Sequence, residues 1–187
     1  LADVLFGVVN PSGILPFTFP VRLEDNGAVA LGEYPGDKEV TYNEGILVGY
    51  RYADTKGIKP LFPFGHGLSY TTFKYGKLTA DKKTTNGDIS FSITVQNTGK
   101  RDGAEVVQLY LHDEKASVLR PYKELKGFEK VFLKAGETKT ITFHITKQDL
   151  SFFNPEQHAW VAEKGTFKAL VGTSSGDIKS TVDFTLE

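Results

Sequence analysis

The chain has 187 residues and a formal net charge of −1, and its hydrophobic and charged fractions, 40% and 24%, are ordinary for a globular protein. With no basic stripe, nothing supports a nucleic-acid partner, and no apolar run reaches the ~20 residues of a membrane-spanning helix. Cysteine is absent, which excludes a disulfide framework and a thiol nucleophile. Because methionine is also absent, even at position 1, we expect a piece of a longer polypeptide.

The first 20 residues predict a short helix, a turn and a strand. Apolar residues at positions 1, 4 and 5 share a helical face, and Gly7 can close the helix. Residues 10–13 read Asn-Pro-Ser-Gly, which is strong turn chemistry. Residues 14–19 are apolar enough for a buried strand, although Pro16 favours an edge or irregular strand.

Residues 21–68 show weak periodicity and many glycines and prolines. A structureless loop of this length is unusual inside a compact domain. We therefore interpret the segment as an extended linker that lies across a neighbouring surface. Its expected anchors are Tyr34, Tyr42, Tyr50 and Tyr52.

Residues 60–73 combine four aromatic residues with two prolines and two glycines, so they fit neither a helix nor a polar loop. Each aromatic side chain gains roughly 1.5–3 kcal/mol on burial. We expect this run to be buried and to hold two bodies together, through Phe62, Phe64, Tyr70, Phe73 and the nearby Tyr75.

The rest of the chain, residues 69–187, predicts an antiparallel β-sandwich, because short strand-like runs recur with turn signals and without a helical period between them. Residues 105–112 are apolar on both faces, which is typical of a central strand. Trp160 is expected in the core or at its rim. The predicted strands cover residues 71–78, 89–95, 105–112, 125–133, 138–146, 159–161, 166–171 and 180–186.

Four blocks of sequence, at residues 10–20, 42–51, 60–73 and 120–128, occur in a recognisable order. Together they resemble the C-terminal part of a glycoside hydrolase family 3 enzyme of the β-glucosidase type. The resemblance covers nearly the whole chain.

This resemblance implies a mainly β fold with three parts. Residues 1–20 would be the helix-plus-strand remnant of an α/β sandwich domain, and residues 21–68 the inter-domain linker. Residues 69–187 would form an antiparallel fibronectin type III-like (immunoglobulin-like) β-sandwich. A strand cut from its sheet exposes backbone donors and acceptors, so residues 14–19 are expected to be frayed, re-packed or paired with another molecule.

The resemblance also implies a parent enzyme that hydrolyses terminal β-D-glucosyl residues with retention. The family's aspartate nucleophile and glutamate acid/base lie in upstream domains, and neither motif has a counterpart in this sequence. We therefore assign no catalytic, cofactor-binding or metal-ligating residue and expect no cofactor. The implied partners are the upstream catalytic domains and the oligosaccharide or glycoside substrate of a periplasmic or secreted parent.

The alternative function is a carbohydrate-binding β-sandwich module. Such a module displays two or three aromatic side chains on one face. The only candidates here are Tyr110, Tyr122 and Trp160, since most other aromatic residues fall at inward positions or in the run at 60–73.

Two residues have side chains of a type that catalysis uses, but we favour a structural role for each. We expect Glu44 to accept backbone N–H groups or to pair with Arg51, rather than to contact substrate. His66 suits proton transfer near neutral pH, but no acid or nucleophile accompanies it, so its ring is expected to bind backbone carbonyls.

The remaining histidines and serines fit no known arrangement. His112, His144 and His158 lack the spacing of metal ligands. Ser12 and Ser69 are outside any Gly-x-Ser-x-Gly turn. The block at residues 120–128 is either a surface that grips a neighbouring domain or sugar polymer or, as we favour, a sheet edge guarded by Pro121, Lys123 and Lys126.

Overall fold

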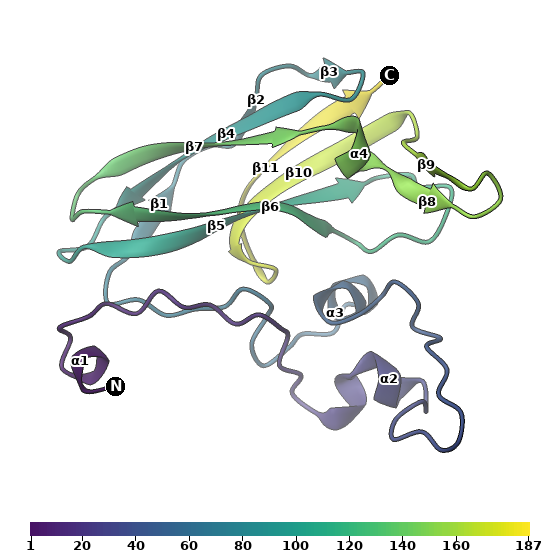
Figure 1. Ribbon diagram of the computed structural model, residues 1–187. Helices are drawn as coiled ribbons and strands as arrows, with labels where there is room; N and C mark the ends of the chain where they lie inside the picture. The colour runs from purple at the N-terminus through teal and green to yellow at the C-terminus, as the bar shows by residue number, and fades with distance from the viewer.

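The structure is a computed structural model that describes residues 1–187. Figure 1 shows two layers of strands, with the N-terminal third of the chain running along one side of them. In the first sheet, β4 (Ile89–Asn97) pairs along its length with β7 (Thr138–Ile145). On its other edge, β4 pairs with both β1 (Phe73–Tyr75) and β2 (Thr79–Ala80).

The second sheet has five strands, and all pairings except the short one between β3 and β11 are antiparallel. Its order is β3 (Thr84–Thr85), β11 (Asp177–Leu186), β10 (Gly165–Ser174), β5 (Gly103–Asp113) and β6 (Glu124–Leu133).

A core of 19 buried residues lies between the two sheets. The strict alternation of β4 puts Ile89, Phe91, Ile93 and Val95 into it. On β5, residues of both faces are buried, which confirms a central strand between β10 and β6. The predicted antiparallel β-sandwich is therefore confirmed.

Four short elements of the sandwich had no prediction: β2, β3, the helix α4 (Lys147–Leu150) and the strand β8 (Phe152–Asn154), which pairs with β9 (Ala159–Val161). At the start of helix α4, the Asp149 carboxylate accepts from the backbone N–H of Thr146 at 2.8 Å and from its hydroxyl at 2.7 Å. An element of two to four residues is too short to leave a periodic pattern in the sequence.

Before the sandwich, the chain forms α1 (Ala2–Leu5), the 3₁₀ turn η1 (Leu23–Asp25), α2 (Gly27–Ala30) and α3 (Tyr50–Lys56). The helix predicted at the N-terminus is confirmed, but residues 21–68 are not structureless. Glycines delimit α3, because Gly49 and Gly57 have φ values of 60° and 66° that other residues rarely adopt. None of these helices has the length and apolar composition needed to cross a lipid bilayer.

The prediction of a strand at residues 14–19 is wrong. This segment makes only two isolated antiparallel bridges, Ile14 with Gly67 and Phe19 with Phe62. Pro16 has no N–H to donate, so a continuous ladder is interrupted in its middle. The segment thus pairs with residues 62 and 67 of the same chain, and the expectation that it is frayed, re-packed or paired with another molecule stays a prediction.

Candidate functional site

The junction between α3 and the sandwich is held by a buried ion pair. Lys123 Nζ lies 2.6 Å from Asp54 Oδ2, and both side chains are largely buried. The rings of Tyr110 and Tyr122 lie 5.8 and 5.3 Å from the ammonium group. Burial raises the pKa of Asp54, and the nearby Lys123 offsets only part of that rise.

Two further hydrogen bonds fix α3 against the start of β6. The backbone N–H of Leu125 donates to the Tyr50 hydroxyl at 2.9 Å, and that of Tyr122 donates to Thr55 Oγ1 at 2.9 Å. The favoured interpretation of the block at 120–128 is therefore wrong for Lys123. The lysine does not guard an exposed edge, because the block grips residues 50–55 of the same chain.

The turn at Asn10 fastens the N-terminal segment to the sandwich. Asn10 Nδ2 donates to the carbonyl of Asp102 at 2.9 Å, while its Oδ1 accepts from the N–H of Tyr70 at 2.8 Å and from Ser69 Oγ at 3.1 Å. The Ser69 hydroxyl thus helps to hold the Asn10 side chain, and it also accepts from the N–H of Thr71 at 3.3 Å.

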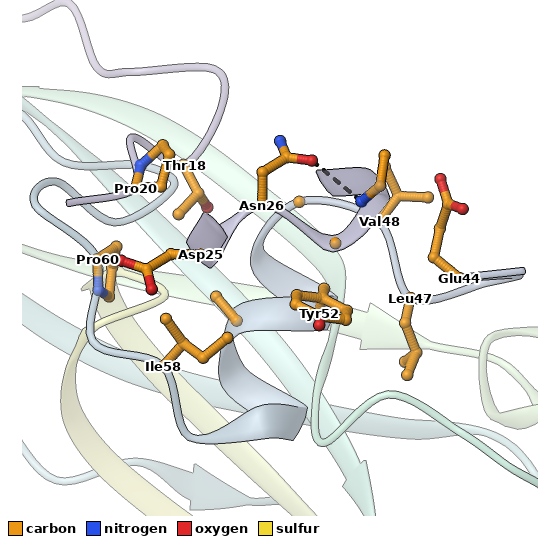
Figure 2. Close-up of a pocket in the computed structure, with 14 residues that line it drawn as sticks. Thr18, Pro20, Asp25, Asn26, Glu44, Leu47, Val48, Tyr52, Ile58 and Pro60 are labelled. Carbon is orange, nitrogen blue, oxygen red and sulfur yellow. Dashed lines mark hydrogen bonds between the residues drawn. The ribbon is translucent and has the colours of Figure 1, made fainter. Parts of the chain in front are cut away.

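A small pocket between α2 and α3 contains two carboxyl groups (Figure 2). Its volume is about 90 Å³. Asp25 is bound by the Arg22 guanidinium at 3.0 Å and by the Arg22 N–H at 3.1 Å. Glu44 is on the other side of Asn26 in Figure 2, and its Oε2 is buried without a hydrogen-bond partner. Neither interaction expected for Glu44 is made by that oxygen.

A second pocket, of about 170 Å³, lies beside β5 and contains Glu105 and Asp177. Glu105 Oε1 accepts from the Tyr75 hydroxyl at 2.8 Å, and burial raises the pKa of this carboxyl group. Asp177 Oδ2 accepts from Lys179 at 2.7 Å and Thr173 at 2.9 Å. These bonds outweigh the effect of burial, so the pKa of Asp177 is lowered.

Glycoside hydrolysis by the usual route needs one carboxyl group to donate a proton and a second to attack carbon or activate water. Three of the four carboxyl groups in the two pockets already bind a resident side chain, Glu44 being the exception. Both pockets are also smaller than the ~300–1,000 Å³ of typical ligand sites. Asp25, Glu105 and Asp177 therefore take part in hydrogen bonds within the chain, and that none of the four carboxyl groups is catalytic stays a prediction.

The four histidines lie in separate places. His66 stacks on Phe62, with ring centroids 5.2 Å apart, where we had expected bonds to backbone carbonyls. His112 packs on the ring of Tyr122, and His144 Nδ1 lies 2.9 Å from Ser90 Oγ. No three His, Asp or Glu side chains are grouped to hold a metal ion.

The aromatic residues depart furthest from expectation. Phe62 and Tyr70 are 41% and 46% exposed, so residues 60–73 are only partly buried here. Among the expected anchors, Tyr52 is buried and Tyr50 stacks on Phe64 at 4.9 Å, but Tyr34 and Tyr42 are exposed.

The three candidates for a sugar platform do not form one. Tyr110 is fully buried, whereas Tyr122 and Trp160 are exposed. Trp160 lies on β9, against Phe153 of β8, and therefore at the rim of the sandwich. The sequence suggested neither the Asp54–Lys123 pair nor the Tyr75–Glu105 bond, whose partners are far apart along the chain.

Two parts of the chain match the models of known protein families. Residues 1–70 match the glycosyl hydrolase family 3 C-terminal domain, and residues 105–175 match the fibronectin type III-like domain. The chain belongs to glycoside hydrolase family 3. The first match crosses the expected boundary at residue 20, and the three-part division of the chain remains a prediction.

The relatives of this chain are β-glucosidases that are much longer than the chain itself. It is 54% identical to a β-glucosidase of Bacteroides ovatus over 98% of this chain and 25% of the relative. It is 56% identical to thermostable β-glucosidase B of Acetivibrio thermocellus, over 95% and 24%. The crystal structure of a family 3 β-glucosidase of Bifidobacterium adolescentis superposes with a TM-score of 0.94 at 43% identity, over 100% and 27%. The chain thus spans about a quarter of these proteins and corresponds to their C-terminal region.

Proposed function

We propose that this chain is the non-catalytic, structural C-terminal portion of a β-glucosidase-type hydrolase. The observation that carries the proposal is the identity above 50% to two β-glucosidases over nearly the whole chain, which spans only a quarter of each. The proposed parent removes terminal β-D-glucosyl residues with retention of configuration. The partners of this portion are the catalytic domains that precede it in the parent.

The geometry supports a bracing role. The sandwich is fastened to residues 1–70 by side chains at two separate places, Asp102 with Asn10 and Lys123 with Asp54. A rigid sandwich therefore fixes the course of the segment that carries the match to the family's C-terminal domain. Bracing of this kind affects catalysis only through the position and stability of the domains it contacts.

The test uses the full-length polypeptide. It should hydrolyse an aryl β-glucoside, and NMR of the first sugar released should show the β-anomer. Substituting an upstream aspartate nucleophile should abolish turnover, whereas substituting Asp25 or Asp177 by Asn should leave kcat within about threefold. A full-length protein without glucosidase activity, or one that depends on either of these carboxyl groups, would overturn the proposal.

The alternative of a carbohydrate-binding module has no supporting observation, because Tyr110 is buried and only two of the three candidate aromatics are exposed. Titration of the chain with cello- and laminari-oligosaccharides tests it directly. We expect no binding at millimolar ligand.

A further inference from the structure

Exposed apolar side chains are concentrated in one part of the chain. Of the 26 large hydrophobic residues that are exposed, 19 lie within residues 1–70. The sandwich, by contrast, exposes only seven and has a single core of 19 buried residues. Scattered exposed hydrophobics are ordinary, but a contiguous apolar surface marks a contact site.

Part of this surface forms a groove of about 670 Å³, which we call the apolar groove. It is lined mainly by Val4, Ile14, Leu15, Phe19, Phe62 and Leu68. No aspartate, glutamate, lysine or arginine lines it. A groove of this chemistry favours aliphatic or aromatic side chains, because it offers few partners for the hydroxyl groups of a sugar.

The walls of the apolar groove are held in place by backbone hydrogen bonds. The N–H of Leu15 donates to the carbonyl of His66 at 2.8 Å, and the N–H of Phe19 donates to that of Phe62 at 2.9 Å. The Tyr70 hydroxyl, at one end, donates to the carbonyl of Val4 at 2.9 Å. Such fixed walls lower the ordering cost of binding a partner.

We infer that the apolar groove is occupied by apolar side chains of the body that precedes residue 1 in the full-length enzyme. The groove is built from the residues that match the family's C-terminal domain, and the relatives extend over about four times the length of this chain. This inference rests on the proposed function for the existence of that body. It adds which surface the body covers and what chemistry it presents there.

The absence of cysteine allows a direct test in the full-length enzyme, with cysteines elsewhere in the polypeptide replaced. Leu68→Cys and Phe62→Cys report on the groove, where the native side chains are 76% and 41% exposed. Trp160→Cys and Phe153→Cys are matched controls on the β8–β9 hairpin, at 63% and 49%. The rate of thiol labelling is measured in the native enzyme and normalised to the rate in denaturant.

We expect both groove cysteines to react at least tenfold more slowly than their controls. Equal rates would overturn the inference. Slow labelling that appears only at high protein concentration would also overturn it, because a second copy of the protein would then cover the groove. Slow labelling that appears only with added glucoside would overturn it as well, because it would indicate a sugar site. Glucosidase activity is assayed on the same samples. A protected groove in an inactive enzyme would count against the proposed function, while an unprotected groove in an active enzyme would count against this inference alone.

Discussion

Lys123 and Asp54 are 69 residues apart in sequence, yet their charged groups lie 2.6 Å apart between the sandwich and α3. Two tyrosine rings flank the ammonium group, and both side chains are largely buried. Burying two charges costs free energy that a close pair offsets only in part, so the pair specifies where α3 docks more than it adds to stability. It is one of several polar contacts that join residues 1–70 to the sandwich.

Removing one partner should therefore be worse than removing both. Lys123→Met leaves the Asp54 carboxylate buried without its counter-charge and should lower the free energy of unfolding by about 3 kcal/mol. Adding Asp54→Asn should recover a large part of that loss. Urea unfolding of the two single variants and the double variant measures this coupling. A double variant as unstable as the sum of the singles would contradict it.

The burial of Glu105 predicts a pH dependence of stability. Burial raises the pKa of Glu105 in the folded state above its ordinary value of 4.5, so the native state holds a proton that the unfolded state has released. The contribution of Glu105 is therefore fully present below about pH 4.5 and is lost as pH rises through the folded pKa.

Glu105→Gln removes this titration while keeping an acceptor for the Tyr75 hydroxyl. As pH rises from 4.5, the free energy of unfolding of the wild type should fall relative to that of Glu105→Gln. A series of urea titrations across pH measures the difference. A difference that does not vary with pH would show that Glu105 titrates in the folded protein as it does in water.

Gly65 should not tolerate a side chain. Its φ is 84°, and a Cβ there would meet the amide group of Gln108, which is buried and bonded to Tyr110 and Thr173. Left-handed strain together with this clash should cost about 2–4 kcal/mol for Gly65→Ala. Gly13→Ala is the matched control, because an added Cβ at Gly13 meets no atom within 4 Å. Thermal unfolding should separate the two variants clearly.

Glu44 is the one pocket carboxylate with an unsatisfied buried oxygen, so it is the residue most open to a catalytic interpretation. We expect Glu44→Gln in the full-length enzyme to keep kcat within about threefold, because the reacting carboxyl groups are proposed to lie upstream. Steady-state kinetics and a melting curve on the same sample measure this. A large loss of turnover at unchanged stability would assign Glu44 a direct role.

The sequence predicted best those elements whose pattern is local and long. Alternation from Ile89 to Val95 predicted β4, and the two apolar faces of residues 105–112 predicted a central strand. The four sequence blocks that resemble glycoside hydrolase family 3 predicted that the chain is the C-terminal part of such an enzyme, and the comparisons confirm this.

Other features had no local signal. The Asp54–Lys123 pair depends on how α3 docks, and nothing near either residue in the sequence indicates the other. Phe62 was expected to be buried on its aromatic character, but its exposure depends on which other groups lie beside it. Residues 14–19 look like a strand by composition, yet their only pairing is the pair of bridges to residues 62 and 67.

The central claim is that this chain supports a hydrolase without performing the reaction. The most direct measurement compares, at equal molar concentration, aryl β-glucoside hydrolysis by the purified 187-residue chain and by the full-length polypeptide. We predict product release at the rate of the buffer blank for the chain and efficient turnover for the full-length protein. Hydrolysis by the chain alone at an enzyme-like rate would contradict the account.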